Sequence, residues 1–176
     1  AQGQADSFLA GPGGVYFNMA DPAGKRRLYV TDGSVAGTRV VDSVLTPDHQ
    51  VEPPIVNAGG RILAWVRDGF YDPEQVWSLS AANPTLQPSV PLMLQSSGDR
   101  SNAAVWNGAL YLPSPGPRND AINHYNRDVE LWRTDGTPAG TFQVRNINQT
   151  TMDSVPRLLA PAGDRTAFIA SSAEFG

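Results

Sequence analysis

The sequence predicts an all-β fold, and three observations carry that prediction. A segment ending in an Asp-Gly turn occurs twice at long spacing, around Asp32 and Asp135. Paired turn residues, Gly-Gly or Asn-Gly, stand before apolar segments at regular intervals along the chain. Apolar residues do not recur with a helical period over ten or more positions, and Pro interrupts most candidate helices. Short antiparallel strands joined by turns account for all three observations.

Composition bounds the protein class. The chain has 176 residues, of which 40% are hydrophobic, so it can bury enough apolar surface to fold. Its 13 basic and 17 acidic residues give a net charge of −4, which argues against nucleic-acid or anionic membrane partners. Its apolar runs, such as 62–66 and 158–162, are too short to span a bilayer. The absence of Cys excludes disulfides, thiol nucleophiles and Cys-ligated metals.

The repeat sets the size of the structural unit. Residues 28–38 (LYVTDGSVAGT) and 131–141 (LWRTDGTPAGT) are plainly alike, and their Asp residues lie 103 positions apart. That spacing is about twice the ~50-residue period of propeller-type repeats, so it predicts a degenerate copy near the midpoint. Residues 76–80 (VWSLS) fit this copy, with the Asp-Gly turn replaced by 81–84 (AANP). Each unit therefore spans about fifty residues.

The turns place the strands within each unit. Gly-Gly and Asn-Gly favour the left-handed torsions of two-residue hairpins, so a strand is expected before each turn and another after it. The strands expected before these turns are 7–10, 55–57, 103–106 and 158–160. The strands expected after the Asp-Gly turns or their degenerate copy are 38–44, 89–94 and 141–147. Each complete unit then holds four strands.

Four-stranded units of this period predict a β-propeller segment of antiparallel blades, because blades bury their faces against one another. A β-sandwich also has short, closely spaced strands, but whole sheets do not recur in it. The expected blades are 1–54, 55–102 and 103–157, followed by the start of a fourth at 158–176. Three and a half blades leave the ring incomplete, so we expect a piece of a longer chain or completion by a neighbouring subunit. Trp65, Trp106 and Trp132 are expected to pack between blades.

The repeat resembles a known family. Residues 130–141, read as Glu-Leu-Trp, two residues, Asp-Gly-Thr, two residues and Gly-Thr, match the full pattern of the bacterial ELWxxDGT repeat family. The first copy departs from it at Arg27, Tyr29 and Ser34, and the middle copy keeps little beyond Trp77. The resemblance implies a propeller in an exported or surface-associated bacterial protein, located outside the cell, at its surface or in the periplasm. Its implied role is binding or structural display.

The Asp-Gly turns are interpreted as structural. Asp32 and Asp135 are expected to accept hydrogen bonds from nearby backbone N–H groups, while Gly33 and Gly136 take positive φ. Ca²⁺ is the one cofactor considered for these turns, since it prefers several oxygen ligands. Each turn offers a single carboxylate, however, so no cofactor and no metal site are expected. The two histidines, at 49 and 124, lack the local spacing of a zinc site.

Two long loops are the candidate ligand-binding surface. In a propeller, loops between the second and third strands share one face with the connections between blades. Aromatic rings beside Asn, Asp and Arg suit a glycan or a peptide, whereas the plain alternative is a pair of solvated insertions. The candidate ligand-binding residues are Phe70, Tyr71, His124, Tyr125, Asn126 and Arg127.

These features favour a non-enzymatic binding or scaffolding module whose partner is a protein or a glycan. One alternative is a glycan-processing enzyme with acids drawn from Asp68, Asp72, Asp120 and Asp128. The other alternative is a structural subunit of a surface assembly that a partner chain completes. No single residue is assigned a catalytic role.

Overall fold

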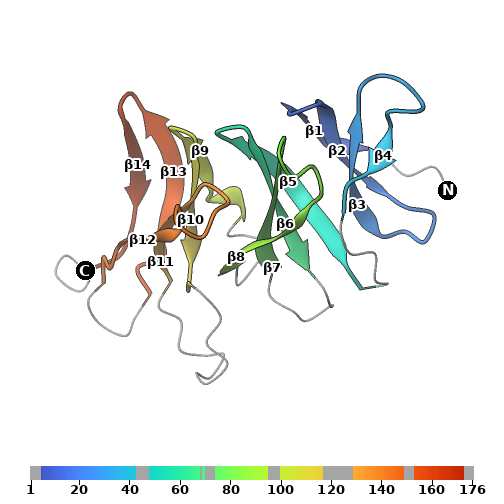
Figure 1. Ribbon diagram of the computed structural model, residues 1–176. Coiled ribbons are helices and arrows are strands. Elements are labelled where there is room, and N and C mark those ends of the chain that lie inside the picture. The colour runs from blue at the N-terminus through green and yellow to red at the C-terminus, as the bar shows by residue number, and fades with distance from the viewer. Residues whose placement is uncertain are drawn as a thin grey trace.

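The computed structural model describes residues 5–42, 48–67, 69, 74–94, 100–116, 129–148 and 153–172. These residues form three four-stranded antiparallel sheets and one hairpin, in each of which the strand order follows the chain (Figure 1). Sheet 1 comprises β1 (Asp6–Gly11), β2 (Gly14–Ala20), β3 (Arg26–Thr31) and β4 (Arg39–Val40). Sheet 2 comprises β5 (Gln50–Ala58), β6 (Arg61–Arg67), β7 (Glu74–Ser80) and β8 (Gln87–Leu94). Sheet 3 comprises β9 (Ala104–Trp106), β10 (Ala109–Ser114), β11 (Glu130–Thr134) and β12 (Phe142–Arg145), and the terminal hairpin comprises β13 (Arg157–Ala162) and β14 (Arg165–Ile169).

In sheets 2 and 3 the first hairpin turns where the sequence predicts, whereas in sheet 1 the turn is formed by Pro12 and Gly13, one residue early, and Gly14 begins β2. Gly59 and Gly60 have φ of 62° and 86°, and Asn107 and Gly108 have φ of 46° and 73°. Two successive positive φ angles give a turn whose twist matches that of the flanking strands, so it closes the hairpin without splaying it. Glycine and asparagine tolerate this conformation because they meet little steric penalty there. The turn residues therefore determine the register of β5 with β6 and of β9 with β10.

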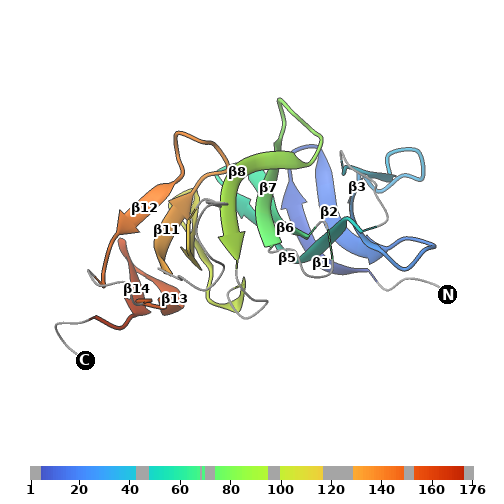
Figure 2. The ribbon, with the colours of Figure 1, turned by 90° about the horizontal axis from the view of Figure 1, so that it is seen from below.

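Sheet 2 lies between sheets 1 and 3 and is buried on both faces (Figure 2). Side chains alternate along β6: Ile62, Ala64 and Val66 pack toward sheet 1, and Leu63 and Trp65 pack toward sheet 3. All five are at most 1% exposed. This double burial explains why β6 is a continuous apolar run and does not alternate with polar residues.

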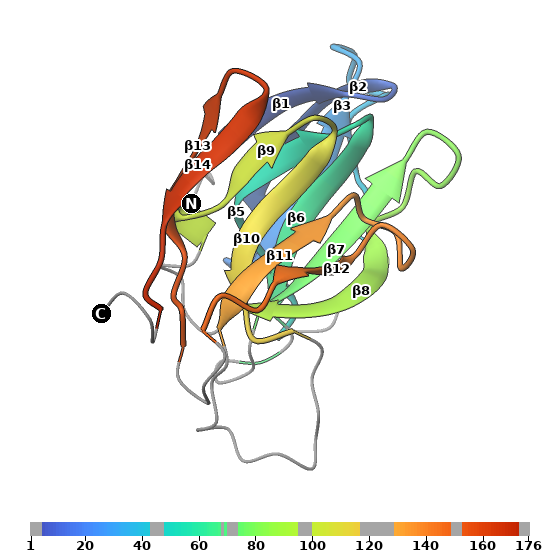
Figure 3. The ribbon, with the colours of Figure 1, turned by 90° about the vertical axis from the view of Figure 1, so that its left-hand side faces the viewer.

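The first strands of successive sheets lie beside one another. β1 contacts β5, β5 contacts β9 and β9 contacts β13, and Figure 3, viewed along the row of sheets, shows these strands grouped together. Asn57 Nδ2 donates to the Ala10 carbonyl at 3.2 Å, and the Leu158 amide donates to Asn102 Oδ1 at 3.3 Å. Each sheet is thus anchored to its neighbour near its first strand.

The all-β prediction is confirmed, and the described residues form three four-stranded antiparallel sheets. The described residues form a row with sheet 1 and the terminal hairpin at opposite ends, and no sheet closes into a ring (Figure 1). The second sheet begins at Gln50, ahead of the unit boundary expected at residue 55.

The fourth strands of sheets 1 and 3 are shorter than the sequence predicts, whereas that of sheet 2, β8, begins two residues before the expected 89–94. β4 covers only Arg39–Val40 of the expected strand 38–44, and β12 covers Phe142–Arg145 of the expected 141–147. After β4 the chain bridges the two sheets: the Val41 amide donates to the Leu28 carbonyl of β3 at 2.9 Å, and the Val41 carbonyl accepts from the amide of Leu86, just before β8, at 2.7 Å. Val41 is 2% exposed in the core between these sheets. Residues 43–47 lie outside the described part of the chain.

Candidate functional site

The Asp-Gly turns of sheets 1 and 3 have the same hydrogen-bonding pattern 103 residues apart. Asp32 Oδ1 accepts from the Ser34 amide at 2.8 Å and from the Ser34 hydroxyl at 2.7 Å. Asp135 Oδ1 accepts from the Thr137 amide at 2.9 Å and from the Thr137 hydroxyl at 2.6 Å. Gly33 and Gly136 follow with φ of 94° and 82°. Both turns have the hydrogen bonds and torsions expected of a structural turn.

Threonines close each turn onto its strand. Thr38 Oγ1 donates to the Ser34 carbonyl at 2.7 Å and lies 2.7 Å from Thr31 Oγ1, which accepts from the Gly33 amide. Since a hydroxyl carries one proton, Thr31 is the donor to Thr38. The same contacts recur in sheet 3, with Thr134 and Thr141 in these roles. The Thr before the Asp and the final Gly-Thr of the repeat are therefore parts of the turn.

The hydrogen bonds keep both carboxylates ionised. The hydroxyl and amide of Ser34 hold the pKa of Asp32 below its ordinary value. Partial burial acts to raise the pKa of Asp135, but the hydrogen bonds from Thr137 outweigh it, and the pKa lies below its ordinary value. In the part of the chain that the structure describes, no three His, Asp or Glu side chains group as metal ligands would. The Oδ1 atoms of both turns already accept two hydrogen bonds each.

The two turns differ in their surroundings. In sheet 3, Gly136 lies against sheet 2, where Ser78 Oγ donates to the Gly136 carbonyl at 3.2 Å. A Cβ atom at Gly136 would stand 2.7 Å from Leu63 and 3.1 Å from the Ser78 Cβ. In sheet 1, by contrast, a Cβ atom at Gly33 would meet no described atom within 4 Å. One copy of the turn is an inter-sheet contact, and the other faces open space.

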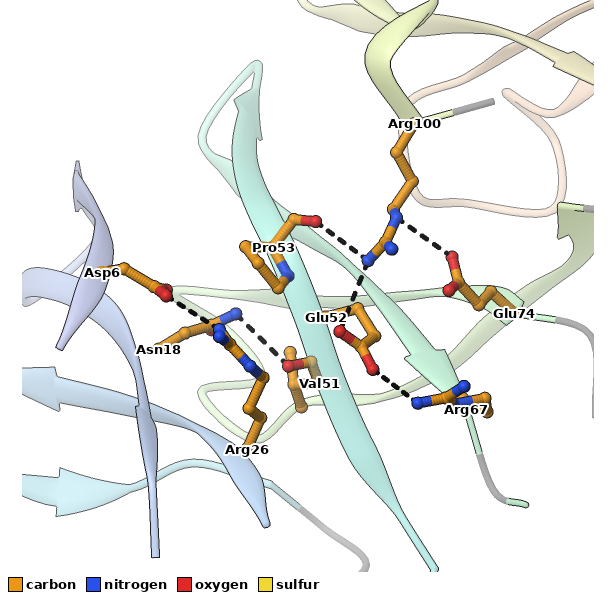
Figure 4. A network of polar contacts seen from close by, with 9 residues as sticks. All are labelled: Asp6, Asn18, Arg26, Val51, Glu52, Pro53, Arg67, Glu74 and Arg100. Atoms are coloured by element: carbon orange, nitrogen blue, oxygen red, sulfur yellow. Dashed lines mark hydrogen bonds and ion pairs between the residues drawn. The ribbon is translucent and has the colours of Figure 1, made fainter. Parts of the chain in front are cut away.

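The opposite ends of the strands carry a cluster of charged residues (Figure 4). Arg100, just before sheet 3, reaches back to sheet 2: its Nε lies 3.3 Å from Glu74 Oε2 and its Nη1 lies 3.6 Å from Glu52 Oε2. Arg100 also donates to the Pro53 carbonyl at 3.0 Å, and Arg67 Nη2 pairs with Glu52 Oε1 at 2.8 Å. These four side chains are at most 24% exposed. Two carboxylates and two guanidinium groups balance one another, so the cluster clamps sheet 3 to sheet 2.

Sheet 1 contributes its own polar contacts beside this cluster (Figure 4). Arg26 Nη1 pairs with Asp6 Oδ2 at 2.8 Å, within the sheet. Asn18, which is fully buried, donates from Nδ2 to the Val51 carbonyl at 3.3 Å and so joins sheet 1 to sheet 2. Polar groups therefore bridge both pairs of neighbouring sheets.

The Glu of the Glu-Leu-Trp segment, Glu130, binds the segment of the chain that leads from sheet 3 to the terminal hairpin. The Glu130 carboxylate, which is fully buried, accepts from the amides of Ile147 and Asn148 at 3.0 and 3.2 Å and from the Ser154 hydroxyl at 2.6 Å. The first copy has Arg27 at this position, and its Nη1 donates to the His49 carbonyl at 2.8 Å. The charge is inverted, and the backbone partner changes from donor to acceptor. Both side chains tie their strand to the chain leading into the next sheet.

All six predicted ligand-binding residues lie outside the described residues: Phe70, Tyr71, His124, Tyr125, Asn126 and Arg127. The carboxylates considered for catalysis also lie there: Asp68, Asp72, Asp120 and Asp128. His49 is described and buried, with its ring 4.9 Å from that of Trp77. Trp65 is buried between sheets 2 and 3, and Trp132 is partly buried against the same cluster, as expected. Trp106 contacts Tyr111 of the same sheet in a tilted arrangement, with ring centroids 5.9 Å apart.

Sequence reasoning missed the cluster around Arg100. Glu52 and Arg100 are far apart in the sequence, and neither belongs to a recognisable motif. The only local signal was charge at strand ends, with Arg67 and Glu74 flanking the loop between β6 and β7. Such charges are usually solvated, so their burial follows from the stacking of the sheets.

Fold and site together define an all-β protein built from several four-stranded antiparallel sheets, two of which, sheets 1 and 3, carry the same hydrogen-bonded Asp-Gly turn. Comparison with protein-family models, with curated proteins and with solved structures finds no match to this chain. In the described residues, no helix has the length and apolar character to cross a membrane.

Proposed function

We propose that this chain is a non-enzymatic β-propeller segment of an exported or surface-associated bacterial protein, acting as a binding or scaffolding module. The observation that carries the proposal is the stacking of sheets 1, 2 and 3 with their first strands side by side, since propeller blades bury their faces in this way. The resemblance of residues 130–141 to the ELWxxDGT repeat supports the family and the location outside the cytoplasm.

The proposed binding surface consists of the loops at 68–73 and 115–129. They join second to third strands in sheets 2 and 3, at the strand ends where Arg67, Glu74 and Glu130 stand. Arg100, from the connection between these two sheets, contacts Glu74, so loops and connections share one end of the stack. Tyr71 and Tyr125 supply aromatic surface there, and the partner is a glycan or a protein segment.

Binding assays with single substitutions test this surface. The biotinylated chain is applied to a glycan array and to a panel of bacterial surface proteins, and its affinity is compared with those of Tyr71→Ala and Tyr125→Ala. Each substitution is expected to weaken binding about tenfold or more, because aromatic anchors dominate such contacts. Val35→Ala, in the Asp-Gly turn of sheet 1 and 96% exposed, is the control at the other end of the strands. Unchanged binding by both tyrosine variants would reject the placement.

A further inference from the structure

The outer face of sheet 1 is apolar and partly exposed, although Phe17 on it is only 8% exposed. Phe8 is 65% exposed and Val15 is 39% exposed. The rings of Phe8, Phe17 and Tyr29 form a stack across β1, β2 and β3, with centroids 5.6 and 5.5 Å apart. An apolar face of this kind on a sheet is unusual in solution without a partner.

Strand register shows which residues of sheet 3 correspond to those on this face of sheet 1. Val15 pairs with Thr31 and Leu110 pairs with Thr134, and each Thr immediately precedes the Asp of its turn. Counting along the strands from these pairs, Val15 corresponds to Leu110, Phe17 to Leu112 and Tyr29 to Trp132. All three corresponding residues of sheet 3 belong to the core shared with sheet 2. The exposed face of sheet 1 is therefore the counterpart of a face that another sheet covers.

The Asp-Gly turns agree with this correspondence. Gly136 of sheet 3 packs on Leu63 and Ser78 of the covering sheet, whereas a Cβ atom at its equivalent, Gly33, would meet no described atom within 4 Å. The two turns are built alike, so only the missing neighbour distinguishes them.

The terminal hairpin carries the other half of the same contact. Ala162 pairs with Arg165 as Ala58 pairs with Arg61, so Ala167 corresponds to Leu63 and Ile169 to Trp65. Leu63 and Trp65 are the β6 residues of sheet 2 that cover sheet 3. Ile169 is 65% exposed. One chain thus carries two complementary faces at opposite ends of its row of sheets (Figure 1). The outer face of sheet 1 corresponds to the face of sheet 3 that sheet 2 covers, and the outer face of the terminal hairpin corresponds to the face of sheet 2 that covers it.

We infer that a second copy of this chain docks head to tail, with β13 and β14 of one copy covering β1 and β2 of the next. Within the chain, β5 contacts both β9 and β10, which are the equivalents of β1 and β2. The strongly exposed residues of sheet 1, Phe8 and Val15, lie on the strands that this arrangement would cover. The contact is heterologous, since the two surfaces differ. The inference rests on the proposed function, because it extends the stacking of repeated sheets from one chain to the next.

Sedimentation velocity over a range of protein concentrations tests the inference. The wild-type chain is expected to associate as concentration rises, and Phe8→Asp and Ile169→Asp are each expected to weaken association about tenfold or more by placing a charge in an apolar contact. A mixture of the two variants is expected to form dimers, because each variant keeps the surface that the other has lost. Val35→Asp, on neither surface, is the control and should associate like the wild type.

Cysteine crosslinking gives a second measurement, since the chain has no native Cys. Phe8→Cys mixed with Ile169→Cys should form a disulfide-linked dimer faster than either variant alone. A wild-type chain that stays monomeric at every soluble concentration, or variant mixtures that neither associate nor crosslink, would overturn the head-to-tail contact and leave the face to further repeats of a longer chain. Loss of glycan or protein binding by the loop variants would leave these measurements unchanged, so the two proposals fail separately.

Discussion

The Asp135 carboxylate occupies the space in which a side chain at Gly140 would have to lie. A Cβ atom built on Gly140 overlaps the carboxylate of Asp135, and a Cβ atom on Gly37 overlaps that of Asp32 in the same way. The Gly of the final Gly-Thr pair is thus required by the carboxylate of the Asp five residues before it, and not by a positive φ of its own. The relationship explains why both residues occur together in the two copies.

Gly140→Ala is expected to destabilise the fold by about 2 kcal/mol, because the added methyl group forces the Asp135 carboxylate away from Thr137. Urea denaturation followed by tryptophan fluorescence measures the change. Ala139→Ser, at the exposed neighbouring position, is the matched control and should stay within about 0.5 kcal/mol of the wild type. A Gly140→Ala variant as stable as this control would contradict the overlap.

Glu130→Ala is expected to lower the free energy of unfolding by about 3 kcal/mol, because it leaves the amides of Ile147 and Asn148 buried without their acceptor. Ser154→Ala removes one donor to the same carboxylate and should cost about 1 kcal/mol. A double-mutant cycle between Glu130 and Ser154 should give a coupling energy of about 1 kcal/mol. Strict additivity of the two losses would show that the hydroxyl contributes nothing to holding the carboxylate.

The free energy of unfolding should fall as the pH rises from about 4 to about 7, because of Asp42. Burial raises the pKa of Asp42 to about 7, against the hydrogen bond from the Leu28 amide and the nearby Arg27, which both lower it. The ordinary pKa is near 3.8, so the folded state binds the proton more tightly than the unfolded state. This contribution to stability is present at pH 4 and is lost progressively up to about pH 7.

Asp42→Asn should remove that dependence, since the neutral amide keeps an acceptor for the Leu28 amide. The free energy of unfolding of the variant, relative to the wild type, is expected to increase between pH 4 and pH 8, by about 4 kcal/mol at most. Chemical denaturation at several pH values gives both curves. Parallel curves for the two proteins would mean that Asp42 is ionised normally in the fold.

Arg100→Ala is expected to destabilise the chain by about 2 kcal/mol, because Glu52 and Glu74 then lose a shared cation in a largely buried place. Arg100→Lys should restore only part of the loss, since a single ammonium group does not reach both carboxylates and the Pro53 carbonyl together. Thermal unfolding of the two variants checks the order. Equal stability of Arg100→Lys and the wild type would show that charge alone, without the guanidinium geometry, holds the sheets together.

Turn chemistry is where sequence reasoning succeeded most fully. The strands before and after Gly59–Gly60 and Asn107–Gly108 lie where those residues predict, since positive φ at both positions permits one tight hairpin geometry. The Asp, the following Gly and the Thr residues of the repeat make local hydrogen bonds, which depend little on the rest of the molecule. The repeat spacing also predicted the second sheet, although its Asp-Gly turn is absent.

The contacts between sheets could not be predicted from the sequence pattern. The clamp of Arg100 on Glu52 and Glu74 joins residues from three separate segments, and charge at strand ends does not identify its partner. After the short β4, Val41 joins two sheets, because its amide donates to Leu28 of sheet 1 and its carbonyl accepts from the amide of Leu86, just before β8. The candidate loop residues, including Tyr71 and Tyr125, stay a prediction.

By itself, the sequence determined the local structure of this protein: hairpins at Gly-Gly and Asn-Gly pairs and a self-contained Asp-Gly turn. These features depend on the allowed torsions of single residues and on hydrogen-bond donors a few residues away, so a short segment of sequence is enough to predict them. Only the tertiary structure decided which faces are covered. Gly33 and Gly136 belong to turns with the same hydrogen bonds, yet one is open and the other packed on Ser78. Burial depends on which sheet stands next in space, and a local pattern carries no information about that neighbour.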